Sequence, residues 1–187
     1  MSDVISATIT RPTLSAKAAR HMVDAAVAEA SAISVPVTVV VVDESGVTKE
    51  MVRMDGAPLV SVQTALNKAY AAAAIGMPPD DFYAAIESDG AVVAEFTTRR
   101  ELALIAGGIP VIADGRVAGA IGVAGAMTAA ADRRIAEAAV EGGAWARAGA
   151  TPASPPRPAG CCAGRCHQSR HLRRQCRGSN PVPTKRG

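Results

Sequence analysis

The chain has 187 residues, of which 49% are hydrophobic, 20% are charged and only 3% are aromatic. This balance supports one globular core built from aliphatic side chains and excludes a wholly disordered chain. No apolar run approaches the roughly 20 residues that a membrane-spanning helix needs. The N-terminal sequence also lacks the basic and apolar stretches of a signal peptide, so the expected location is cytoplasmic.

The net charge of +3 is unevenly distributed and changes sign at about residue 148. Residues 1–147 contain all 17 acidic residues and have a net charge of −5, whereas 148–187 contain eight basic residues and no acidic one. We therefore predict one domain at 1–147 and a basic tail rich in Cys, Pro and Arg at 148–187. The tail has no helix or strand periodicity, which favours disorder over metal binding and over contact with nucleic acid.

The sequence of the first part of the domain predicts a helix followed by a β-hairpin. Thr13 or Ser15 can cap an amphipathic helix that ends before Pro36. Residues 35–43 are β-branched almost throughout, which predicts a strand buried on both faces. Residues 47–54 alternate in polarity and form the returning strand of the hairpin.

Two further helices are predicted in the middle of the domain. Residues 61–76 form an alanine-rich helix that Gly76 closes. Residues 81–88 form a short helix with acidic residues at its start. The stretch 89–104 has no clear periodicity, and no structure is assigned to it.

Residues 109–125 give the clearest prediction, a hairpin with an Asp-Gly turn at 114–115. Glycines in its second strand indicate close approach by another group, for which we expect a ligand or a subunit contact. A last helix starts at Thr128 or Asp132 and runs to about Trp145. This order of elements predicts an α/β (α+β) fold: a mainly antiparallel sheet with helices packed on it, in a single domain.

Three segments form a specific combination: MVRMDGAP at 51–58, NKAYAAAAIG at 67–76, which contains Lys68, and GGIPVIADGRVAGAIGVAG at 107–125. Together they resemble the GlcG/HbpS family of heme-binding proteins, whose domain also forms the C-terminal part of PduO-type cobalamin adenosyltransferases. The resemblance covers about 14–140. It implies a profilin-like α/β sandwich, heme as a cofactor, homo-oligomers from dimers to octamers, and a place beside catabolic operons.

The chain departs from that family pattern in two places. Ala126 stands where relatives commonly have a second glycine, although the downstream acidic residue, Asp132, is kept. Residues 89–107 are charged and rich in Val where relatives have a glycine-rich segment. We therefore expect any pocket wall built from 89–107 to differ.

His21 is the first candidate ligand residue, because it is the only histidine of residues 1–147 and imidazole commonly binds heme iron. It lies on the shoulder of the apolar stripe of the first helix, so a half-buried structural role is the alternative. Thr97 and Thr98 could coordinate weakly through oxygen. Sulfur ligands could come from methionines that otherwise fill the core, namely Met22, Met51, Met54, Met77 and Met127.

Arg53, Asp55 and Lys68 form a second candidate site, for the carboxylates of heme or of a small acid. Two cations beside a carboxylate suit an anionic ligand, and an arginine can bind a carboxylate through two parallel hydrogen bonds. The alternatives are that Asp55 caps the following helix or pairs with Arg53.

A cofactor-independent enzyme acting on a small organic acid is the alternative function. Asp55 or Glu101 would act as the base and Lys68 as the acid in an isomerisation, hydration or elimination. An arginine would hold the substrate carboxylate: Arg53, Arg99 or Arg100. No nucleophile–histidine pair, phosphate-binding loop or metal-ligand cluster is seen in the sequence of residues 1–147.

Overall fold

The computed structural model describes residues 8–142, so the predicted tail at 148–187 and the predicted helix end at Trp145 lie outside the described residues. The elements in chain order are α1 (Ala16–Ala32), β1 (Thr38–Asp43), β2 (Thr48–Arg53), α2 (Val60–Ile75), α3 (Pro79–Ile86), α4 (Gly90–Thr97), β3 (Gly108–Ala113), β4 (Arg116–Ala124) and α5 (Ala129–Glu141).

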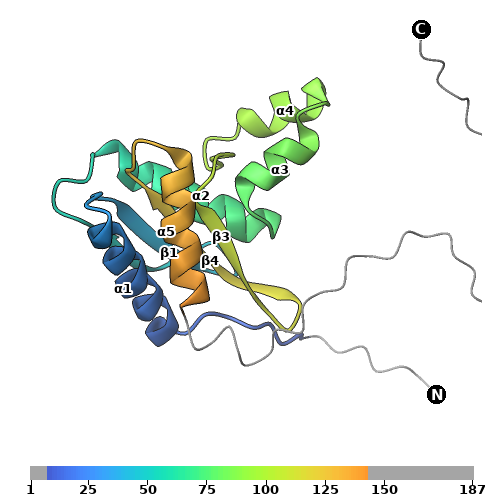
Figure 1. The fold of residues 1–187 in the computed structure, drawn as a ribbon. Coiled ribbons are helices and arrows are strands. Elements are labelled where there is room, and N and C mark those ends of the chain that lie inside the picture. Colours follow the sequence, from blue (N-terminus) through green and yellow to red (C-terminus); the bar gives the residue numbers. More distant parts are fainter. Residues whose placement is uncertain (1–7, 143–187) are drawn as a thin grey trace, which may run out of the picture. The chain divides into compact units, whose positions relative to one another are not determined.

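The strands form one antiparallel sheet in the order β2-β1-β4-β3. Helices α1 and α5 pack together on one face of this sheet, and α2 covers the other (Figure 1). Helices α3 and α4 form a pair beside the C-terminal end of α2 (Figure 1). This arrangement confirms the predicted fold class, an antiparallel sheet with helices packed on it in a single domain.

Local sequence explains where most elements begin and end. The Ser15 hydroxyl caps α1 by accepting a hydrogen bond from the Ala18 N–H at 3.1 Å. Gly76 ends α2 with a φ of +81°, and the β3–β4 turn has positive φ at both Asp114 and Gly115. The unassigned stretch 89–104 contains α4, which Asp89 caps through the N–H groups that follow it.

The two faces of the sheet have cores of different composition. The face under α1 and α5 buries large side chains such as Met22, Ile121 and Ile135. The face under α2 buries two valines of β1 and a set of alanines. Small side chains on both α2 and the sheet let the helix lie close to the strands.

Gly122 of β4 is explained by this close packing. A Cβ on Gly122 would overlap the Ala65 carbonyl oxygen and the Ala69 nitrogen of α2. A Cβ on Gly108, its partner across the ladder, would overlap the backbone carbonyl of Lys68. The expectation that a ligand or a second subunit makes this close approach is corrected, because the approaching groups are α2 at Gly122 and Leu14 at Gly119, both of the same chain.

Within residues 8–142, no helix combines the length and the apolar character needed to cross a bilayer.

Candidate ligand-binding site

A buried ion pair joins α2 to α5 at the end of the sheet where β1 begins and β4 ends. Lys68 Nζ lies 2.7 Å from Asp132 Oδ2 and donates a second hydrogen bond to the Val123 carbonyl at 3.0 Å. The other carboxylate oxygen accepts the Ala126 N–H at 3.0 Å. The two side chains are only 1% and 6% exposed. Burial raises the pKa of the Asp132 carboxyl, and the hydrogen bond and positive charge of Lys68 oppose that rise.

This ion pair borders a cavity of about 290 Å³, which we call the helix-terminus cavity. Val60 and Ser61 from the start of α2 line it, as does Ala129 from the start of α5. Helix N-termini carry partial positive charge and attract anions. Helix α2 begins without a side-chain cap and without an acidic residue in its first turn, so its positive end is not compensated locally.

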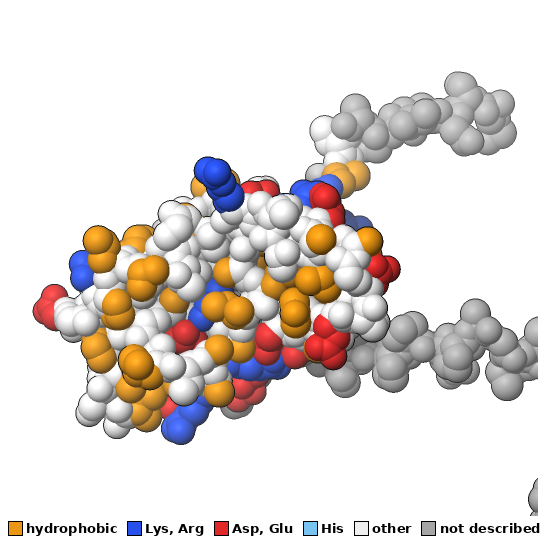
Figure 2. Space-filling model, turned by 90° about the horizontal axis from the view of Figure 1, so that it is seen from above, with side chains coloured by type: hydrophobic (Ala, Val, Ile, Leu, Met, Phe, Trp, Pro, Cys, Tyr) orange, Lys and Arg blue, Asp and Glu red, His pale blue; other side chains and the backbone are white. Residues whose placement is uncertain are grey.

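A second cavity of about 530 Å³ adjoins the first, and Ile105 and Ala129 line both. Its walls are mostly apolar and include Tyr83 of α3 and the leucines at 102 and 104, so we call it the apolar cavity. Figure 2 looks onto this end of the molecule and shows hydrophobic side chains spread across it. An apolar surface and the uncapped start of α2 therefore lie side by side.

Ion pairs and aromatic packing hold the walls of the apolar cavity. Arg133 of α5 contacts Asp80 at 2.5 Å and Asp81 at 2.8 Å, which fixes the start of α3 against α5. Phe82 and Phe96 pack edge to face with ring centroids 5.0 Å apart, which joins α3 to α4.

Arg53, Asp55 and Lys68, the predicted trio, have different surroundings in the structure. Arg53 donates hydrogen bonds from Nε and Nη2 to the Ala57 carbonyl, at 3.0 and 2.6 Å, and so closes the turn before α2. Asp55 is exposed; it neither caps α2 nor forms a salt bridge with Arg53 within the described residues. Of the three residues, only Lys68 lines the helix-terminus cavity.

The candidate heme ligands also occupy different places. His21 is exposed on α1, which lies on the sheet face that α2 does not cover. It lines neither cavity. Met22 is fully buried in the core. Met127 is 98% exposed and lines the helix-terminus cavity, and Thr97 lines the apolar cavity. Among the described residues, no three His, Cys, Asp or Glu side chains gather in a way that could hold a metal ion.

Arg100 and Glu101 share a third cavity, of about 460 Å³, beside the outer surface of α2. Tyr70 and Asn67 also line it, and the Asn67 amide donates to the Arg100 carbonyl at 2.8 Å. Lys68 lines a different cavity. Lys68 and Glu101 therefore line different cavities and Asp55 lines neither, and the catalytic roles of these residues remain predictions.

Sequence reasoning missed two parts of the site, the pairing of Lys68 with Asp132 and the apolar wall around Ile105. The two glycines at 107–108, where β3 begins, indicate the pairing of Lys68 with Asp132. Gly107 has a φ of +115°, and a Cβ there would lie 2.9 Å from both Lys68 Nζ and Asp132 Cβ. The apolar wall falls largely in a stretch that shows no periodicity.

The chain is an α/β domain in which helices cover both faces of a four-stranded antiparallel sheet. Residues 14–141 match the family described as haem degrading protein HbpS-like, and the chain belongs to that family.

Known proteins of similar sequence and structure agree with this assignment. An uncharacterised 15.0 kDa protein from the dhaT–dhaS intergenic region of Citrobacter freundii is 37% identical over 130 residues, which is 69% of this chain and 91% of that protein. Klebsiella pneumoniae ORFY is 29% identical with a TM-score of 0.69, over 74% of this chain and 96% of its own. A heme complex of PduOC is 28% identical with a TM-score of 0.64, over 69% and 94% of the two chains.

Proposed function

We propose that this protein binds heme, or another amphipathic anion of similar size, across the apolar cavity and the helix-terminus cavity. The observation that carries the proposal is the wall shared by the two cavities at Ile105 and Ala129. Heme combines a flat apolar ring with two carboxylates, so it needs apolar walls next to positive groups. When bound, heme supplies a redox-active iron.

The chemistry of the two cavities fits the two parts of this ligand. Tyr83 and the leucines of the apolar cavity offer contacts to a porphyrin ring. The start of α2, which has no side-chain cap and no acidic residue in its first turn, offers partial positive charge to propionates. The start of α5 is capped by Thr128, and the charge of Lys68 is paired with Asp132, so the positive end at the cavity comes from α2. Family membership and the heme complex of the similar PduOC structure support the same ligand.

Of the side chains considered as iron ligands, only Thr97 and Met127 line the two cavities. His21 lies elsewhere, on the surface of α1. The proposal therefore favours Met127 or Thr97 as the iron ligand. Coordination of the iron by His21 is the competing prediction.

A hemin titration of the full-length chain, followed by Soret absorbance, tests the proposal. We expect saturable one-to-one binding that weakens about tenfold or more in Ile105→Glu, because a carboxylate in the shared wall repels propionates and wets an apolar surface. Ile112→Glu is the matched control, since Ile112 is 52% exposed against 48% for Ile105 and lines neither cavity.

The same titration includes two further full-length variants. Replacing Cys161, Cys162, Cys166 and Cys176 together by Ser removes adventitious thiol ligands in the tail. His21→Ala tests the competing iron ligand. Equal affinities for the Ile105 and Ile112 variants, or loss of binding in His21→Ala alone, would overturn the cavity assignment.

The expected surroundings of this function are proposals too. Assembly into homo-oligomers, from dimers to octamers, and action in the cytoplasm remain predictions. A place beside a catabolic operon draws support from the Citrobacter relative, which is encoded between dhaT and dhaS.

A further inference from the structure

A separate charged cavity of about 490 Å³ lies at the opposite end of the sheet, where β1 ends and β4 begins. It is lined by Arg11 from the segment before α1, Glu44 from the β1–β2 turn, and Arg116 with Val117 from the start of β4. The cavity and the heme site proposed above lie at opposite ends of β1. This strand has 6 residues, so at about 3.3 Å per residue the two sites are about 20 Å apart.

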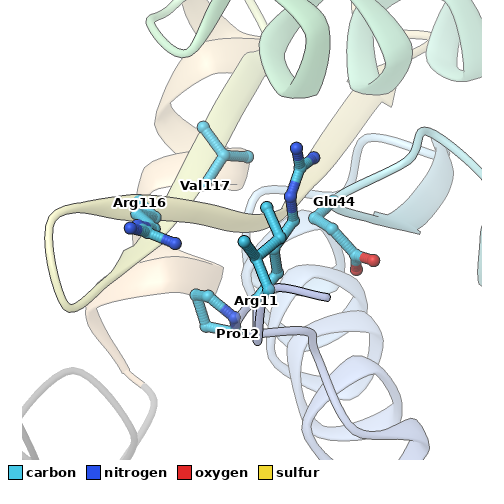
Figure 3. A pocket seen from close by; sticks show the side chains of 6 residues that line it. Arg11, Pro12, Glu44, Arg116 and Val117 are labelled. Carbon is cyan, nitrogen blue, oxygen red and sulfur yellow. The ribbon is translucent and has the colours of Figure 1, made fainter. Parts of the chain in front are cut away.

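The two arginines are available to a ligand. Figure 3 shows Arg11 and Arg116 on either side of Val117. Arg116 donates one long hydrogen bond, 3.4 Å from Nη1 to the Thr10 carbonyl, and neither guanidinium forms a salt bridge within residues 8–142. Each guanidinium can bind one carboxylate through parallel hydrogen bonds.

Glu44 adds a negative group with an unmet hydrogen-bonding need. Its Oε2 atom is buried and accepts no hydrogen bond from the described residues. The Thr13 hydroxyl and the backbone N–H of Glu44 itself lower the pKa of this carboxyl, so it is ionised at neutral pH. The side chain is half-buried, and its other oxygen accepts from the Ser45 hydroxyl at 3.4 Å. Oε2 is therefore the acceptor position left open, and a ligand ammonium would supply its donor.

We propose that this cavity binds an acidic amino acid, with Arg11 and Arg116 holding its two carboxylates and Glu44 holding its ammonium group. The cavity carries two positive charges and one negative charge, and the ligand carries the opposite set. Ile9, Pro12 and Val117 provide apolar surface for the methylene groups. The site is independent of the heme proposal, because it shares no lining residue with either cavity of that proposal.

Calorimetric titration of the full-length chain with L-glutamate and with glutarate tests the role of each charge. The two acids share five carbons and two carboxylates, and only glutamate has an ammonium. We expect glutamate to bind about tenfold more tightly than glutarate, as one charge-assisted hydrogen bond implies. Arg11→Gln and Arg116→Gln should each weaken both ligands about tenfold, whereas Arg134→Gln, an exposed arginine on α5, should weaken neither.

Glu44→Gln gives the sharpest outcome, because it keeps the shape of the side chain and removes its charge. The preference should reverse towards glutarate, since the cavity then carries two uncompensated positive charges. An unchanged melting temperature and unchanged hemin affinity would show that the variant is folded. Absence of glutamate binding at millimolar concentration, equal affinity for the two acids in the wild type, or an unchanged preference in Glu44→Gln overturns the proposal.

Discussion

Lys68 and Asp132 are 64 positions apart in the sequence, yet their ion pair organises the residues around the helix-terminus cavity. Lys68 reaches across the end of the sheet to the Val123 carbonyl, and Asp132 holds the chain at Ala126. Gly107 leaves the space that the two side chains need. Removing one partner of such a buried pair typically costs about 3–5 kcal/mol, because the other charge is left without compensation.

The first residue-scale prediction concerns Lys68→Met, which leaves the Asp132 carboxylate buried without its cation. Without the opposing effect of Lys68, burial raises the pKa of Asp132 further above its ordinary value. A group with a raised pKa in the folded state contributes stability that is present at low pH and lost as pH rises through that pKa. Urea denaturation should therefore show a loss of about 3–5 kcal/mol at pH 8 that shrinks towards pH 4.

The matched variant is Lys68→Met combined with Asp132→Asn, which removes the charge and retains an acceptor for the Ala126 N–H. It should be more stable than Lys68→Met at pH 8 and similar to it at pH 4, because a protonated Asp resembles Asn. A stability loss in Lys68→Met that does not vary with pH would contradict this account of the ion pair.

At the scale of elements, the packing of α2 on the sheet depends on paired glycines in neighbouring strands. Gly122 of β4 faces Gly108 of β3 across the ladder, and both lie against the α2 backbone. Backbone atoms cannot move aside as a flexible side chain can, so an added methyl group must displace the helix.

Gly122→Ala should therefore lower the free energy of unfolding by about 1–3 kcal/mol, the usual cost of overpacking a core. Gly90→Ala is the control: a Cβ there meets nothing within 4 Å, and alanine favours the helix α4 that begins at Gly90. Urea denaturation of both variants checks the prediction. If Gly122→Ala is as stable as the wild type, α2 does not limit the space at β4.

The fold was largely predictable because its elements carry local information. Ser15, Gly76 and the Asp-Gly turn at 114–115 each determine a boundary through the chemistry of one or two residues. Helix α4 was not predictable, since it buries no residue and shows no amphipathic period. Its start depends on the Asp89 cap, and its position depends on the packing of Phe96 against Phe82.

The candidate site was less predictable, because its parts meet only through the tertiary structure. Lys68 was identified from its sequence context, but its partner comes from another helix. Arg53 and Asp55 are close to Lys68 in sequence, yet the turn at Ala57 uses the Arg53 guanidinium locally. Of the predicted trio, the sequence therefore identified one residue that lines the helix-terminus cavity, Lys68, but not the contacts that this residue makes.

At the scale of the whole molecule, the described residues form complete cores on both faces of the sheet. The α1/α5 face and the α2 face each bury a continuous apolar cluster drawn from residues between 14 and 139. Residues 1–147 carry a net charge of −5, and residues 148–187 add eight positive charges. The charge of the tail can therefore influence the stability of the domain, although the residues of both described cores come before residue 142.

Removal of residues 148–187 separates these two effects. Because both cores lie before residue 142, we expect the melting temperature to change by less than about 2 °C, since 1 kcal/mol corresponds to about 2–4 °C in a chain of this size. Differential scanning calorimetry at low and at high salt checks this expectation. A loss seen only at low salt would indicate screened attraction between opposite charges. A loss of more than about 5 °C at both salt concentrations would mean that the tail belongs to the folded core, and the boundary at residue 148 would be wrong.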